Sequence, residues 1–359
     1  MADPYPIRPI TVDEYVGFRR VHEHAFNSGP VSAPRWARTV SLFEPDRSLA
    51  AFDAALPADE AQVGTTGVYS LRMTVPGGAL PAAGVSAVSV LPSHRRRGVL
   101  RSLMRRQLAD LAARGGEPIA VLWASETPIY ARYGYGRASS TAYLRFERGD
   151  GALAATAPAD PALTLRLAEP QAATAALAQV YDTVRPAQPG FFARSDDWWG
   201  RVLADEPDER RGFSPLRCLL AEDGAGARGY ALYAAAERWD EPTGLPDGRL
   251  VVRELIAADP AAGAALWHNL LTRDLVSVVT AEYRSADDPL LYQLLDSAGP
   301  ARRSATGSGC GSSTCRARLP GARTAARWTW CSRSPTSCWQ ATRAGGGCAQ
   351  PGLAARARR

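Results

Sequence analysis

The sequence predicts an α/β protein of the α+β type, in which two similar units each form a mixed sheet flanked by helices. One observation is that short apolar runs typical of strands alternate with segments of helical periodicity. Another is that the order of these segments over residues 1–148 returns loosely over residues 163–299. Composition is the third, because a chain of 359 residues that is 46% apolar can bury the cores of two domains.

The first unit, residues 1–148, is predicted to run strand, helix, strands, and then strand, basic loop, helix and strand. Its clearest element is a helix over 97–114, in which Leu and Met recur at helical spacing until Gly115 and Gly116 end it. An earlier helix is predicted over 13–24. Strands are predicted over 7–10, 48–52, 65–75, 84–90 and 119–123.

The second unit, residues 163–299, follows a predicted linker over 149–162 that is rich in Ala, Pro and Asp. Its predicted strands are 165–167, 216–222, 228–234, 250–257 and 275–282, and its predicted helices are 170–184, 262–271 and 289–297. Because this order resembles that of the first unit, we interpret the two as copies of one fold.

The tail, residues 300–359, breaks the pattern. It holds 11 Arg and no acidic residue, and it contains no Val, Ile, Phe, Met or Tyr. Such a segment cannot bury enough apolar area to offset its ordering entropy, so we predict disorder. One hypothesis is that a frameshift near residue 300 replaced a third domain, because an alternative reading phase allows strand-like runs. The alternative is a natural Arg-rich tail.

The charge of the body differs from the net +6 of the whole chain. All 42 basic residues are Arg, and removing the 11 in the tail leaves 31 against 36 acidic residues, a net of −5. We therefore do not expect a nucleic-acid partner.

No secretory leader follows Met1, and no run approaches the ~20 apolar residues of a membrane helix. We expect a cytoplasmic protein without a membrane partner.

No metal is expected either. The six Cys match no zinc pattern well, and the four His show no metal-ligand spacing: His22, His24, His94 and His268.

The segment Val88–Leu100 is the strongest candidate for a binding site. A strand ends there, a loop with Arg95, Arg96 and Arg97 follows, and a helix starts at Gly98. A helix N-terminus offers unpaired N–H groups and a positive dipole to a pyrophosphate, and a glycine lets the backbone approach closely. The strand could present its backbone groups to an extended, amide-bearing arm such as pantetheine. The alternative is that the three Arg are a solvated charge run.

Two motifs make the resemblance specific. Pro92–Arg101 reads PSHRRRGVLR, and Trp123–Gly136 reads WASETPIYARYGYG. The first resembles the acetyl-CoA motif of GNAT acetyltransferases, and both together resemble the Eis (enhanced intracellular survival) family over roughly residues 5–300. The resemblance implies two tandem GNAT-like domains and a third, sterol-carrier-protein-like domain, which is missing or degenerate here.

The resemblance also implies a function and a set of site residues. The implied activity is acetylation of primary amines, of the aminoglycoside or lysine type, by acetyl-CoA in a homohexamer. Acetyl-CoA would contact a strand, the loop with its helix start, and the end of the next strand: Val88, Ser89, Val90, Arg96, Arg97, Gly98, Val99, Leu100, Arg101, Ser125 and Glu126. Phe26 and Trp36 would line the amine pocket, although Trp36 is equally typical of a core residue.

Tyr130 matches the general acid of the family. A phenol beside the sulfur can protonate the thiolate as the tetrahedral intermediate collapses. Without the resemblance, packing against Tyr133 and Tyr135 would be the favoured explanation of Tyr130.

The general base has no match. In the family the C-terminal carboxylate of the chain acts as the general base, whereas this chain ends in Arg359 after a tail without a secondary-structure pattern. The family also has an acidic pocket residue near the first helix, where this chain has Phe26, Asn27 and Ser28. A non-catalytic GNAT-like binding or scaffold protein is therefore the alternative function.

Overall fold

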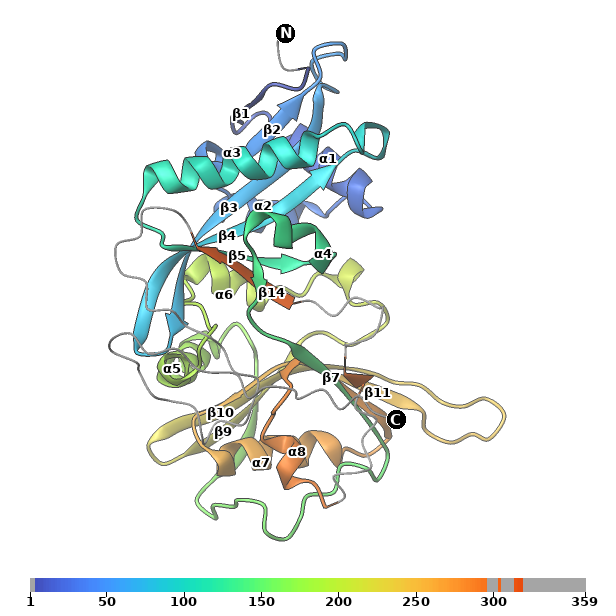
Figure 1. Ribbon diagram of the computed structural model, residues 1–359. Helices are drawn as coiled ribbons and strands as arrows, with labels where there is room; N and C mark the ends of the chain where they lie inside the picture. Colours follow the sequence, from blue (N-terminus) through green and yellow to red (C-terminus); the bar gives the residue numbers. More distant parts are fainter. Residues whose placement is uncertain (1–3, 296–302, 305–312, 319–359) are drawn as a thin grey trace, which may run out of the picture. The chain divides into compact units, whose positions relative to one another are not determined.

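The computed structural model describes residues 4–295, 303–304 and 313–318. They form two seven-stranded mixed sheets (Figure 1). The first has the order β1-β2-β3-β4-β5-β14-β6, and the second has the order β13-β7-β12-β11-β10-β9-β8. The pairs β4–β5 and β11–β12 are parallel, and the other pairs are antiparallel. The two predicted units thus share one architecture, as the sequence indicated.

The strands of the first sheet are β1 (Ile7–Pro9), β2 (Leu49–Phe52), β3 (Gln62–Val75), β4 (Gly78–Val90), β5 (Ile119–Ala124), β6 (Gly136–Arg137) and β14 (Ser313–Arg318). Those of the second are β7 (Thr141–Glu147), β8 (Thr164–Ala168), β9 (Arg217–Asp223), β10 (Gly226–Ala236), β11 (Gly248–Ala257), β12 (Val276–Ser285) and β13 (Arg303–Ser304).

The helices are α1 (Tyr15–Phe26), α2 (Ala33–Ser41), α3 (Val99–Arg114), α4 (Thr127–Tyr130), α5 (Thr174–Val184), α6 (Asp196–Val202), α7 (Pro260–Leu271) and α8 (Leu290–Gln293). The sequence predicted α1, α3, α5, α7 and α8 with bounds that differ by a few residues. It did not predict α2, a short helix that has no fully buried residue.

The two halves exchange a strand, which the sequence did not predict. Strand β7 lies within the predicted first unit, 1–148, yet it pairs with β12 in the second sheet, where Phe146 lies opposite Val279. Strand β14 follows the second unit, yet it pairs with β5 in the first sheet. Each sheet is therefore completed by a strand from the other half of the chain.

The tail also departs from its prediction. Arg303–Ser304 and Ser313–Arg318 are strands, so the predicted disorder does not hold for these residues. The remainder of 300–359, and with it most of the segment in the frameshift hypothesis, lies outside the described residues.

Opposite faces of the first sheet carry different helices (Figure 1). Tyr15 and Phe18 of α1 pack with Ala50 of β2, and Trp36 of α2 joins them. On the other face, Met104 and Leu111 of α3 pack with alternate residues of β3, β4 and β5: Val68, Ala83, Val85, Ala120 and Leu122. Each face of the sheet is therefore covered by helices.

The second sheet shows the period of two that a strand imposes on its side chains. In β9, Cys218 and Leu220 pack toward α5 and α6, whereas Leu219 and Ala221 pack toward α7. Strand β10 alternates in the same way. Both faces are apolar because both are covered by helices.

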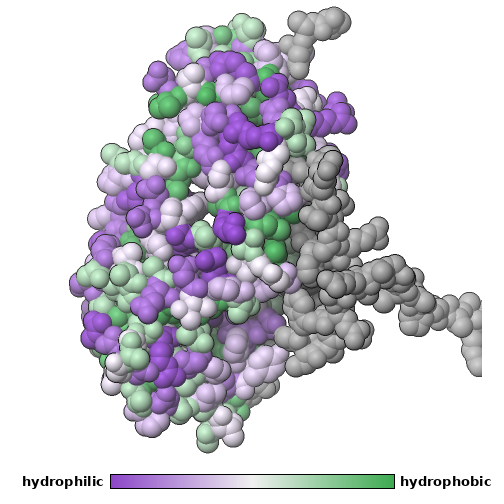
Figure 2. Space-filling view, turned by 90° about the vertical axis from the view of Figure 1, so that its left-hand side faces the viewer, coloured by the Kyte–Doolittle hydropathy of each residue, from purple (hydrophilic) through white to green (hydrophobic). Residues whose placement is uncertain are grey.

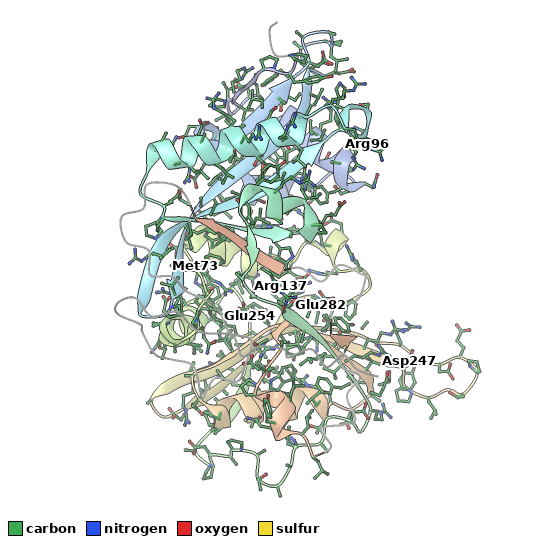
Figure 3. The ribbon with its side chains drawn as sticks, viewed as in Figure 1. Met73, Arg96, Arg137, Asp247, Glu254 and Glu282 are labelled. Carbon is green, nitrogen blue, oxygen red and sulfur yellow. The ribbon has the colours of Figure 1, made fainter. Side chains whose placement is uncertain are left out.

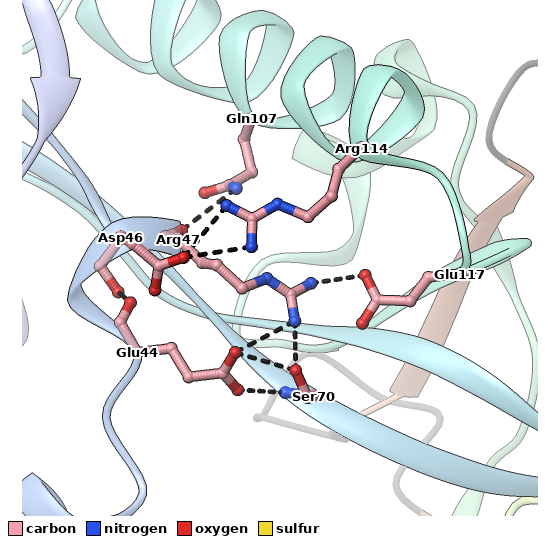
Figure 4. Close-up of polar contacts among 8 residues, drawn as sticks. Glu44, Asp46, Arg47, Ser70, Gln107, Arg114 and Glu117 are labelled. Carbon is pink, nitrogen blue, oxygen red and sulfur yellow. Dashed lines mark hydrogen bonds and ion pairs between the residues drawn. The ribbon is translucent and has the colours of Figure 1, made fainter.

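A buried arginine fixes the far end of α3 (Figure 4). Arg47 forms ion pairs with Glu44 and with Glu117, which precedes β5. Its carbonyl oxygen accepts a hydrogen bond of 3.4 Å from Nε2 of Gln107 in α3. The network thereby links the start of β2 to α3 and to the entry of β5, the elements that flank the candidate site.

The surface in Figure 2 mixes hydrophilic and hydrophobic residues in small groups. Among the described residues, no helix combines the length and the apolar character needed to cross a bilayer.

Candidate functional site

Strands β4 and β5 separate at the point where the predicted site begins. Their parallel pairing runs from Ala82 opposite Ile119 to Val85 opposite Leu122. Beyond Val85, β4 continues to Val90 beside β3, whereas β5 pairs with β14 along its whole length, on its other edge. The last residues of β4 therefore have one edge without a strand partner among the described residues. That edge can bind an extended amide-bearing ligand.

A β-bulge lies in this open part of β4. The register with β3 shifts between Thr65–Ser89 and Gly67–Ser86, so two residues of β4 face one of β3. Ala87 takes a left-handed conformation with φ of 50°. Its carbonyl oxygen accepts a hydrogen bond of 2.8 Å from Oγ1 of Thr65, which stabilises the bulge. Such strained residues are frequent at functional sites.

The turn before α3 leaves the helix N-terminus open. After β4 the chain forms a 3-10 turn over Pro92–His94, and Arg96 and Gly98 both have positive φ, 64° and 87°. Gly98 is the N-cap of α3, and no side chain caps this end. The space beside Gly98 is open, since a Cβ there would meet only Nη2 of Arg101, at 3.8 Å. The first N–H groups of α3 can therefore bind an anion.

The arginines around this turn are exposed, and Figure 3 places Arg96 at the N-terminal end of α3. Arg97 donates a hydrogen bond of 3.0 Å to the hydroxyl of Tyr5, which raises the pKa of the guanidinium. The same bond directs the Arg97 side chain toward the first residues of the chain. Arg96 lies two residues before Gly98, and Arg101 lies three residues after it. Together they make the turn electropositive.

His94 holds the loop in place. It is buried, its Nε2 lies 3.2 Å from Oδ2 of Asp53, and its Nδ1 lies 2.9 Å from Oγ of Ser93. Its ring also packs edge-on against Tyr5. These contacts indicate a structural role.

Tyr130 lies close to the predicted cofactor residues in space. It ends α4, has 9% of its surface exposed, and belongs to the apolar cluster against which Val88 of β4 and Leu100 of α3 pack. Its ring is 5.9 Å from that of Tyr135, edge to face. Three elements of the predicted site thus meet in one cluster. Ser125 and Glu126, between β5 and α4, are exposed.

The two predicted amine-pocket residues differ in their surroundings. Phe26, at the end of α1, has 46% of its surface exposed. Trp36 is half-buried, and its ring centre lies 5.1 Å from that of Tyr15, below the guanidinium of Arg19. The packing of Trp36 agrees with the core interpretation that its sequence context left open.

A contact that the sequence did not predict lies on the α1 side of β4. His22 is half-buried, and its Nδ1 is 3.1 Å from Oγ of Ser89, a predicted cofactor residue. Its ring lies 4.5 Å from that of Phe26. The spacing of His22 and Phe26, four residues on one helix, was visible in the sequence. The partner on β4 was not, because it depends on the packing of α1 against the sheet.

The second unit differs at the equivalent helix. At the N-terminus of α7, Asp259 accepts hydrogen bonds of 3.0 Å from the N–H groups of Ala261 and Ala262. Arg228 in turn pairs with Asp259. A carboxylate thus occupies the position that α3 leaves open, and residues 257–265 contain no Arg, which disfavours a phosphate there.

Comparison with known proteins gives the family. Residues 6–138 and 190–318 match two models, each described as an acetyltransferase (GNAT) domain. The N-acetyltransferase Eis of Mycobacterium tuberculosis is 34% identical over 297 residues, which cover 80% of this chain and 68% of that protein. The crystal structure of Eis1 from Mycobacterium abscessus matches with 31% identity and a TM-score of 0.67, covering 88% of this chain and 74% of that one. The chain belongs to the Eis family of GNAT N-acetyltransferases.

The relatives are longer than this chain. An uncharacterized N-acetyltransferase of Streptomyces coelicolor is 41% identical over 273 residues, which cover 76% of this chain but 65% of the relative. The chain therefore spans less than two-thirds of the length of this relative.

GNAT acetyltransferases use acetyl-CoA as their acyl donor. The open edge of β4 fits its amide-bearing pantetheine arm, and the uncapped turn before α3 fits its diphosphate. In the part of the chain that the structure describes, no group of His, Cys, Asp and Glu could hold a metal ion.

Proposed function

We propose that this protein is an N-acetyltransferase that transfers the acetyl group of acetyl-CoA directly to a primary amine. The observation that carries the proposal is the opening between β4 and β5, which leads to the uncapped N-terminus of α3. The pantetheine arm would pair with the backbone of Val88, Ser89 and Val90. The diphosphate would bind the N–H groups of Gly98, Val99 and Leu100, beside the guanidinium groups of Arg96, Arg97 and Arg101.

Tyr130 would act as the general acid. The amine attacks the thioester carbon, a C–N bond forms, and the C–S bond breaks as Tyr130 gives its proton to the sulfur. The phenolate then recovers a proton from the new ammonium nitrogen. The burial of Tyr130 beside Val88 and Leu100 supports this role, because these two residues flank the proposed donor from β4 and α3.

The amine would enter from the α1 side of β4. Phe26 offers an exposed aromatic ring there, and Trp36 supports the neighbouring packing. Amines of the aminoglycoside or lysine type are the proposed substrates, following the family. Ser125 and Glu126 would close the donor site from the end of β5.

The proposal has a direct test. Purified protein is mixed with acetyl-CoA and a panel of primary amines, including an aminoglycoside and Nα-acetyl-lysine, and thiol release is followed. We expect amine-dependent release of free CoA, and acetyl-CoA alone at 100 times its Kd should raise the melting temperature by roughly 5 °C. Binding without thiol release from any amine would favour the scaffold alternative instead.

The conformation of Gly98 gives a second prediction. Gly98→Val forces a branched side chain into φ of 87° and into the space proposed for the diphosphate. We expect the Kd for acetyl-CoA, measured by titration calorimetry, to rise about 10- to 100-fold.

Gly115→Val is the matched control. Gly115 follows the other end of the same helix, also has positive φ (70°), and is likewise open to solvent. It should lower stability while leaving acetyl-CoA affinity unchanged. An equal loss of affinity in both variants would contradict the placement of the diphosphate.

The assembly and location of the protein also follow the family. We propose a cytoplasmic homo-oligomer, a hexamer as in the family pattern. Light scattering of the purified chain tests the oligomeric state.

A further inference from the structure

We propose that His22 is the general base that removes a proton from the substrate amine. This inference rests on the proposed acetyl transfer and adds the residue that the family resemblance left unassigned. It starts from one juxtaposition: a histidine of α1 lies between an exposed aromatic residue on the proposed amine side and a serine of the strand proposed to hold the cofactor.

The side chain of His22 contacts residues of both the proposed amine side and the proposed cofactor strand. Nδ1 of His22 lies 3.1 Å from Oγ of Ser89, and the His22 ring lies 4.5 Å from the ring of Phe26. Ser89 is buried within the open part of β4, next to the bulge at Ala87. The contact with Ser89 fixes the imidazole at the proposed cofactor strand, and Nε2 is left to exchange protons with the amine.

The chemistry of the reaction requires such a group. An alkylamine like that of lysine has a pKa near 10.4, so only about 1 in 10³ molecules is neutral at pH 7. A base that takes the first proton from the ammonium creates the nucleophile. His22 then releases that proton to water, while the second amine proton returns to Tyr130 after it has protonated the sulfur. The products are the amide, the thiol and one proton.

The surroundings of His22 keep it neutral. Burial, and then the guanidinium of Arg19, lower the pKa of His22 from its usual 6.5, with Arg35 of α2 acting in the same direction and Glu23 opposing them. Glu23 is itself paired with Arg19, and Arg35 with Glu209. The uncharged imidazole can accept a proton at neutral pH, which is the state that a general base needs.

His22→Gln tests the proposal, because glutamine can still contact Ser89 but cannot take up a proton. With an alkylamine substrate we expect kcat at pH 7 to fall about 10²- to 10³-fold. The deficit should shrink as the pH rises toward 10 and the free amine accumulates. The acetyl-CoA Kd should stay unchanged.

His24→Gln is the control, since His24 lies on the same helix but is exposed. It should match wild type at every pH. A His22→Gln variant as fast as wild type at pH 7, or one slowed by the same factor at every pH, would overturn the base assignment while leaving the acetyltransferase proposal intact. A wild-type protein that releases no thiol with any amine would instead defeat the proposed function itself.

Discussion

Replacing Tyr130 with phenylalanine is expected to lower kcat by about 10²- to 10⁴-fold while acetyl-CoA binds as it does to wild type. The hydroxyl is the only group removed, and the ring that packs with Val88 and Leu100 is retained. Loss of the acid leaves the thiolate to depart unprotonated, which raises the barrier by about 3–5 kcal/mol. Steady-state kinetics with saturating amine measure kcat, and calorimetry measures the acetyl-CoA Kd.

Tyr133→Phe is the matched control for this prediction. Tyr133 follows three residues later, packs against the same apolar cluster, and burial raises the pKa of its hydroxyl. Its replacement should leave kcat within a few-fold of wild type. If both variants retain full activity, Tyr130 is a packing residue, and the thiolate leaves without help from it. If both variants lose activity equally, the tyrosines support the fold of the site by their packing, and neither is the proton donor.

The order of elements around the candidate site was predictable because each one has a strong local signal. The strand that ends at Val90, the arginine loop and the leucine pattern after Gly98 predicted strand, turn and helix in turn. Gly98 stands just before Val99 in place of Ser, Thr, Asp or Asn, and the structure has no side-chain cap there. Local sequence signals therefore predicted the elements that form the proposed acetyl-CoA side of the site.

The partners of these elements were not predictable. Strand β7 (Thr141–Glu147) was not among the predicted strands, and nothing in its sequence indicates that it pairs with β12 in the other half. The contact of His22 with Ser89 joins residues 67 positions apart and depends on how α1 packs. Tertiary pairing of this kind is set by the whole core rather than by local propensity. The contact therefore places beside the candidate site a residue that neither motif contains.

Arg47 was missed for a related reason. A lone arginine in a loop predicts a solvated side chain, and its burial follows only from the carboxylates that surround it. In the structure its side chain is 6% exposed, and that of Glu117 is 12% exposed (Figure 4). The pair lies where the chain leaves α3 for β5, so it supports α3, which carries Leu100, and β5, which Ser125 directly follows.

Arg47→Met is expected to reduce the free energy of unfolding by about 3–5 kcal/mol, because it leaves Glu117 and Glu44 near one another without their cation. Methionine keeps much of the volume, so the loss reports the charge rather than a cavity. Urea unfolding followed by circular dichroism measures the change through the midpoint and the slope.

Arg114→Ala removes the neighbouring exposed pair with Asp46, in which the side chains are 52% and 68% exposed. Its expected cost is about 0–1 kcal/mol, because both charges stay solvated. Adding Glu117→Gln to Arg47→Met should recover part of the loss by removing one of the uncompensated charges. A cost for Arg47→Met no greater than that for Arg114→Ala would mean that water reaches Arg47, and that α3 and β5 are held together by their apolar contacts alone.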